Sequence, residues 1–250
     1  SASEYPQCFL NANRKKEKKR IILNGFKRTK ELLEILKPKY FIPAGGSYVT
    51  YGKYSSIQQF VAHPSHNQIE KYFKKIPDLR VLKLDCNSSV NINLNKFSLN
   101  QKKQKKTITQ VLNDFKNKKY SYSKYKLNYD LSELFSAAKQ NYFDTLNKLN
   151  ITINWTINFY IYENLCLNNQ GRIINKDNYI STFALSGNRK GKKFQILNCY
   201  LDKKLFISLL SGKSYGWNLS LGGSLVMFER FPNRFIPTVP FSLNFLKKSR

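Results

Sequence analysis

The only imidazoles of the chain, His63 and His66, lie three residues apart in the segment Ala62-His63-Pro64-Ser65-His66. Neutral imidazole is a common metal ligand, so this spacing would allow both rings to serve one metal site. A catalytic zinc site needs at least three protein ligands, however, and no third ligand is identifiable by its spacing. Without a metal, His63 and His66 are simply two polar residues of a loop. We expect the chain alone to hold no metal ion.

The cysteines add no metal motif, because no two of them form a C-x-x-C pair: Cys8, Cys86, Cys166 and Cys199. Their spacing excludes a zinc ribbon, and nothing in the sequence argues for disulfides. No apolar run is long enough to span a bilayer, and no signal peptide precedes Tyr5. We therefore expect a reduced, cytoplasmic protein without a transmembrane segment.

Two glycine-containing loops raise the question of phosphate binding. The segment 44–47, Ala-Gly-Gly-Ser, would let a ligand approach the backbone, but it lacks the Lys-Ser/Thr of a phosphate-binding loop. The segment 212–214, Gly-Lys-Ser, has Ile207 where the first glycine of that motif would stand. Neither loop is a nucleotide-binding motif, and segment 44–47 is better explained as a tight exit from a strand.

The chain is strongly basic, because 43 Lys and Arg residues oppose 15 Asp and Glu residues, which gives a net charge of +28. Such a chain attracts phosphates, RNA and anionic membranes, with an affinity that falls as salt rises. Lysine dominates over arginine, as an AT-rich genome would produce, and no Gly-aromatic RNA-binding motif is evident. The charge therefore leaves two interpretations open. It can reflect a lysine-rich composition that attracts nucleic acids only weakly, or it can belong to dedicated phosphate-binding patches at segments 14–20 and 102–106.

The first 105 residues follow an α/β pattern. A helix is expected over 13–36, because apolar residues recur there at the helical period, and Pro38 ends it. The elements expected after it are a short buried strand at 40–42, a short helix around 69–76, strands at 80–84 and 90–94, and a polar, Lys-rich linker over 95–106. This arrangement is typical of α/β units, in which loops beyond the strands carry function.

From residue 106 onward the pattern is that of an α+β unit. Asp130 is placed to cap a helix, and a second helix should begin at Asp202 and end at Gly212. Residues 151–162 alternate apolar and polar side chains, which predicts a strand with one packed face and one wet face. Segments 179–185 and 194–197 are expected to be its antiparallel partners. This unit should open with a helix over 108–115.

Four stretches, taken in order, resemble a known family. They are Ala2-Ser3-Glu4-Tyr5-Pro6-Gln7-Cys8-Phe9, the segment 36–46 containing Pro43-Ala44-Gly45-Gly46, the segment Val81–Cys86, and Trp217-Asn218 through Arg230-Phe231-Pro232-Asn233. Their order is similar to metallo-β-lactamase-fold proteins of the UlaG-like group, particularly those similar to CMP-N-acetylneuraminate hydroxylase. The similarity covers most of the chain and lies downstream of the family's metal-binding half.

The resemblance implies an α/β fold in which residues 1–105 form the second half of a metallo-β-lactamase αββα sandwich and residues 106–250 form an accessory α+β domain. It implies zinc or iron in a complete protein, with ligands supplied mostly by an N-terminal half of the same fold that would precede Ser1. The chain begins with Ser rather than Met, so we expect a processed terminus or a fragment. Tyr5, Ser47, Tyr48 and His63 are then expected to line the substrate pocket, without a defined catalytic role.

Three functions follow as hypotheses. The first is part of a metal-dependent hydrolase or oxygenase-like enzyme that acts on a small anionic substrate, either a nucleotide sugar or a phosphorylated compound. The second is a basic RNA- or ribosome-associated binding protein, which the net charge of +28 motivates. The third is a lipid-binding accessory domain, because the region from Ile151 onward is loosely similar to sterol-carrier domains, with antiparallel strands followed by a Leu-rich helix.

Overall fold

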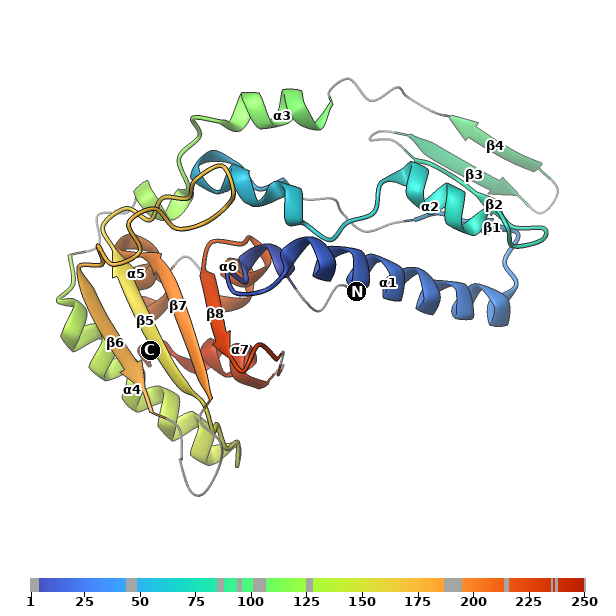
Figure 1. Cartoon of the computed structure of the whole chain (residues 1–250). Helices are drawn as coiled ribbons and strands as arrows, with labels where there is room; N and C mark the ends of the chain where they lie inside the picture. Colours follow the sequence, from blue (N-terminus) through green and yellow to red (C-terminus); the bar gives the residue numbers. More distant parts are fainter. Residues whose placement is uncertain are drawn as a thin grey trace.

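The computed structural model describes residues 5–43, 49–84, 88–93, 96–100, 107–124, 128–186, 195–213, 216–234, 236 and 238–249. They form a mixed α/β fold (Figure 1). The α-helices are α1 (Arg14–Leu36), α2 (His66–Phe73), α3 (Ile108–Phe115), α4 (Leu131–Lys148), α5 (Lys203–Ser211), α6 (Trp217–Gly222) and α7 (Thr238–Ser242). The 3-10 helices are η1 (Pro6–Cys8), η2 (Gly52–Phe60), η3 (Ser121–Lys124) and η4 (Leu243–Phe245). The strands are β1 (Tyr40–Phe41), β2 (Arg80–Val81), β3 (Ser89–Asn93), β4 (Lys96–Asn100), β5 (Thr156–Tyr162), β6 (Ser181–Leu185), β7 (Ile196–Asp202) and β8 (Met227–Phe231).

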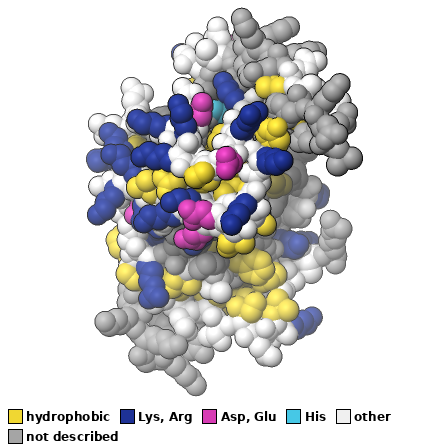
Figure 2. Space-filling model, turned by 90° about the vertical axis from the view of Figure 1, so that its right-hand side faces the viewer, with side chains coloured by type: hydrophobic (Ala, Val, Ile, Leu, Met, Phe, Trp, Pro, Cys, Tyr) yellow, Lys and Arg dark blue, Asp and Glu magenta, His cyan; other side chains and the backbone are white. Residues whose placement is uncertain are grey.

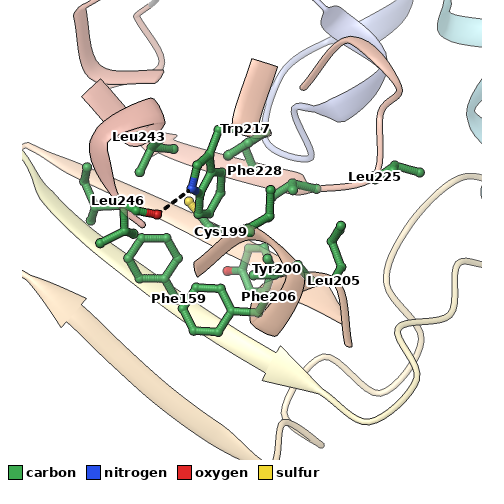
Figure 3. Packing of buried hydrophobic residues seen from close by; sticks show 14 of the residues in the cluster. Phe159, Cys199, Tyr200, Leu205, Phe206, Trp217, Leu225, Phe228, Leu243 and Leu246 are labelled. Atoms are coloured by element: carbon green, nitrogen blue, oxygen red, sulfur yellow. Dashed lines mark hydrogen bonds between the residues drawn. The ribbon is translucent and has the colours of Figure 1, made fainter. Parts of the chain in front are cut away.

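The main sheet has the strand order β6-β5-β7-β8, and α4 and α5 cover one of its faces (Figure 1). Phe159, from the centre of β5, is fully buried on this face. Its ring lies 5.3 Å from that of Phe206 on α5 and 5.9 Å from that of Trp217 on α6 (Figure 3). The indole nitrogen of Trp217 donates a 3.1 Å hydrogen bond to the carbonyl of Leu246, which satisfies its only polar group inside the core.

Two predictions for this sheet were wrong in part. Strand β6 is antiparallel to β5 as expected, but β7 runs parallel to β5. The chain reverses at each connection, so β7 has the direction of β5, and it pairs with β5 rather than with β6. The second face of β5 is only partly exposed, because Asn158 and Tyr160 are half-buried and Tyr162 is buried, with its hydroxyl donating to the carbonyl of Lys176.

Helix α1 confirms the expected helix over 13–36. The Asn13 side chain caps it by accepting from the backbone N–H of Lys16, and Lys37 ends it in the left-handed conformation. Figure 1 shows α1 running from the edge of the main sheet to the part of the molecule that holds α2, β1 and β2. There Phe26 and Leu33 of α1 pack with Phe73 of α2 in a small second core.

Strands β1 and β2 confirm the positions of two predicted strands, although each has only two paired residues. They form a parallel pair, Tyr40 opposite Arg80 and Phe41 opposite Val81. The predicted linker over 95–106 instead contains β4, which pairs with β3 as an antiparallel ribbon. Within this polar segment, polar and apolar residues alternate in Lys-Phe-Ser-Leu at 96–99, which is the pattern typical of a strand.

The main core contains residues from both sides of the predicted domain boundary at residue 105. Cys8, Tyr54 and Ile57 are buried in the same cluster as Phe159 and Trp217. The division into 1–105 and 106–250 and the αββα sandwich stay predictions, and the fold is a mixed α/β arrangement with a mixed sheet. No helix within the described ranges has the length and apolarity needed to cross a membrane.

Candidate ligand-binding site

A cavity of about 250 Å³ lies between the N-terminal segment, the edge of the main sheet and helices α6 and α7. Its walls come from parts of the chain that are more than two hundred residues apart in sequence. The lining residues are Tyr5, Cys8, Phe9, Trp155, Leu197, Asn218, Leu221, Phe228, Arg230, Arg234, Ile236, Val239, Pro240 and Phe241. Most of this wall is aliphatic or aromatic, and its polar groups are few.

The N-terminal wall is fixed to β8 by backbone pairing. The N–H of Leu10 donates a 2.8 Å hydrogen bond to the carbonyl of Phe228, and Phe9 bridges to Phe228 in the parallel direction. The Asn11 side chain acts like a peptide group toward Arg230, because its amide donates to the Arg230 carbonyl at 2.8 Å and its oxygen accepts the Arg230 N–H at 3.3 Å. Residues 9–11 therefore extend the main sheet beyond β8 and close one side of the cavity.

Buried contacts hold the rest of this segment. The Gln7 side-chain amide donates to the hydroxyl of Ser224 at 2.9 Å, and both residues are buried. Burial raises the pKa of the Cys8 thiol to about 12, so the thiol is neutral at physiological pH. It contributes to the cavity as a small apolar group rather than as a nucleophile.

Two arginines give the cavity its charge. Arg230 is 8% exposed, its guanidinium carbon lies 4.1 Å from the centre of the Phe9 ring, and its Nε donates to Asn233 at 2.9 Å. Arg234 also lines the cavity and is exposed to solvent. Guanidinium stays charged at all physiological pH values and offers five N–H donors in a planar fork. A positive charge thus lies beside an apolar space.

Of the two predicted pocket residues that the structure describes, Tyr5 lines this cavity and His63 does not. Ser47 and Tyr48 lie outside the described residues. His63 lies half-buried in the loop between η2 and α2, where burial lowers its pKa, and it is not among the lining residues. His66 is the first residue of α2, so it belongs to a helix terminus that Ser65 caps with a capping box.

No group of three or more His, Cys, Asp or Glu side chains that could hold a metal occurs among the described residues.

Sequence patterns did not single out Arg230 and Arg234 as cavity residues. The signal was present, since these are two arginines four residues apart in a chain whose basic residues are mostly lysine. Their position beside Tyr5 and Phe9 depends on long-range packing, which sequence spacing does not reveal.

A second buried polar cluster is centred on Asp202, which is 3% exposed. One carboxylate oxygen accepts from the Lys53 ammonium at 2.5 Å and from the Tyr122 hydroxyl at 2.7 Å, and the other accepts the Leu165 N–H at 2.6 Å. Asp202 starts α5 as predicted, but its side chain makes no capping hydrogen bond to that helix. It instead joins η2, η3 and the loop after β5, which is a structural role.

The fold and cavity define a mixed α/β protein with an apolar, arginine-flanked cavity at one edge of its sheet. No family model, curated protein or solved structure matches the chain.

Proposed function

We propose that this chain binds a small organic anion in the cavity between η1, β8, α6 and α7. The observation that carries the proposal is the pair Arg230 and Arg234 in the wall of an apolar cavity. A charged group near low-dielectric surroundings interacts with an opposite charge much more strongly than it would in water. The cavity therefore favours an anion over a neutral molecule of the same shape.

The test compares a carboxylate with its neutral amide. Isothermal titration calorimetry with octanoate and octanamide should show at least about tenfold tighter binding of the carboxylate, since a charge-assisted hydrogen bond contributes about 1.5–3 kcal/mol. The variant Arg234→Gln should lose most of this preference, whereas Arg28→Gln on the exposed face of α1 removes the same charge elsewhere and should leave it. Equal binding of acid and amide to the unaltered chain would refute the proposal.

A second candidate is the metal-dependent hydrolase or oxygenase-like enzyme, completed by a further polypeptide. Two observations favour it. The parallel pair β1–β2 has only two residues per strand, whereas parallel sheets are larger and covered on both faces. At the end of α1, Leu32, Ile35 and Leu36 are 58%, 76% and 71% exposed. Figure 2 shows hydrophobic side chains lying among Lys and Arg on this side of the molecule.

Both features suit a surface that another part of the same fold would cover. We propose that metal ligands come from that part, which the sequence resemblance places before Ser1. The coding DNA upstream of Ser1 should then contain an in-frame His-x-His-x-Asp-His motif. A stop codon directly upstream of Ser1 would contradict this candidate and would not affect the cavity proposal.

The RNA-binding alternative rests on charge, because α1 carries nine basic residues against three acidic ones. Replacing Lys15, Lys16, Lys18 and Lys19 with Gln tests whether that charge is a dedicated site. Loss of four phosphate contacts would flatten the log–log salt dependence of RNA affinity by roughly three units, whereas diffuse attraction predicts a much smaller change. A flattening of that size would favour RNA binding over the small-anion proposal.

A further inference from the structure

We infer that the ligand of the cavity is an amphipathic acid: a medium-length alkyl or acyl chain that fills the apolar interior, with a carboxylate or phosphate held at Arg230 and Arg234. This inference rests on the proposed function and adds the chemical class of the ligand. It does not follow from the arginines alone, because a short anion such as acetate would satisfy them equally well.

The tail is inferred from the apolar wall. Leu197 and Val239 are buried and face the cavity from the sheet and from α7, and Phe228 adds an aromatic surface from β8. A ligand with many ring nitrogens and oxygens would lose hydrogen bonds to water that so apolar a wall cannot replace. A nucleotide base or a sugar therefore fits poorly, whereas a hydrocarbon chain gains free energy by leaving water.

The volume sets the length of the chain. The cavity measures about 250 Å³. A water-sized group occupies about 30 Å³ of liquid volume, and a methylene group is of similar size, so the cavity holds about eight such groups. A four-ring sterol is too large for it, and a chain of roughly eight carbons matches it.

The head group is inferred from the position of the charges. Arg230 is almost buried and stacks on Phe9, so it lies within the cavity wall, whereas Arg234 is exposed. The wall of the cavity therefore contains one nearly buried arginine and one arginine at the surface. Their planar forks match the two oxygens of a carboxylate or the oxygens of a phosphate. The hydroxyl of Tyr5 and the amide of Asn218 are further polar groups in the same wall.

The experiment is a chain-length series of n-alkyl carboxylates, from acetate through octanoate to tetradecanoate, titrated into the complete chain by calorimetry. Each methylene buried should tighten binding about fourfold, until the cavity is full near octanoate and the affinity stops rising. Octyl phosphate, run beside octanoate, identifies the preferred head group, and either preference supports the inference.

Two variants make the result specific to this cavity. Leu221→Trp fills part of the space and should weaken octanoate at least about tenfold, because several methylenes lose their site. It should leave acetate unchanged. Leu219→Trp, on an exposed position of the same helix α6, is the matched control and should bind octanoate normally. Circular dichroism of each variant confirms that it is folded.

The outcomes separate this inference from the proposed function. Carboxylates that bind with no dependence on chain length would overturn the amphipathic ligand and leave the small-anion proposal standing. Octanol that binds as tightly as octanoate would overturn the role of the arginines, and with it both proposals. Absence of binding by every carboxylate and by octyl phosphate would also overturn both.

Discussion

The change Asp202→Asn should destabilise the protein by about 3 kcal/mol. The substitution keeps the shape of the side chain and removes its charge. In the native chain, Asp202 accepts hydrogen bonds from three donors, Lys53, Tyr122 and the backbone of Leu165. An asparagine has one acceptor oxygen, and its amide group is itself a donor. At least one of the three donors would therefore face an N–H group instead of an oxygen.

The magnitude follows from the burial of each partner. Removing one member of a buried ion pair costs about 3–5 kcal/mol, because the remaining charge stays uncompensated. The Lys53 side chain is 23% exposed, so its ammonium can turn partly toward water, which places the loss near the lower end of that range. The loss includes no capping hydrogen bond of helix α5, because the Asp202 side chain makes none.

Urea unfolding followed by circular dichroism measures this loss as a lower midpoint with an unchanged slope. For a chain of this size, the same loss lowers the melting temperature by roughly 6–12 °C. The matched control is Asp130→Asn, the same chemical change at an exposed helix cap, where the carboxylate accepts from the N–H groups of Ser132 and Glu133. Asparagine caps helices as well as aspartate does, so the control should stay within about 0.5 kcal/mol of the native chain. A loss at Asp202 no larger than that of the control would refute the reasoning.

Three further predictions concern backbone, pH and metal. Gly171→Ala should cost about 3 kcal/mol, because φ is +66° and a Cβ would lie 2.7 Å from the Ile57 side chain. Gly212→Ala, at φ +65° with its Cβ in ordinary contact, 3.8 Å from the Lys247 side chain, should cost about 1 kcal/mol. Equal losses in urea unfolding would count against the packing argument. Burial raises the pKa of the Cys8 thiol from 9.0 to about 12, so the folded state holds the thiol proton more tightly than the unfolded state. The contribution of this thiol to the free energy of unfolding is therefore fully present below pH 9 and is lost as the pH rises toward 12. The stability difference between the native chain and Cys8→Ala should therefore fall by roughly 2.6 kcal/mol between about pH 8 and 11, and a constant difference would contradict this. The dialysed chain should retain no stoichiometric zinc or iron in elemental analysis, and one tightly held ion per chain would show that metal ligands lie within it.

Local signals predicted three helices well. The periodic apolar residues placed α1 over 13–36, the cap at Asp130 placed the start of α4, and Asp202 and Gly212 placed the two ends of α5. Helix α2 was expected around 69–76 and lies three residues earlier, at His66–Phe73. These features depend on neighbours three or four residues away, which the sequence displays directly. The alternation over 151–162 likewise located β5, although only residues 156–162 form the strand.

Long-range packing explains what the sequence did not show. The pairing of β7 with β5 depends on which side of β5 the chain returns to, and alternation of side chains contains no such information. The role of Asp202 as a buried acceptor depends on Lys53, which lies 149 residues away along the chain. The cavity similarly requires residues 5–11 to pair with β8, through contacts such as that of Asn11 with Arg230. Tyr5 was predicted to line a pocket from a family resemblance, and only the structure places Phe9 and the two arginines beside it.

Photo-crosslinking tests the central claim, that this cavity holds an anionic ligand, most directly. An octanoate analogue with a diazirine at the end of its chain would be irradiated with the complete chain, and the labelled peptides would be identified by mass spectrometry. The account predicts labels on lining residues such as Phe9, Leu221 and Ile236, which an excess of unlabelled octanoate suppresses. Labels that fall elsewhere, or that octanoate fails to suppress, would contradict it.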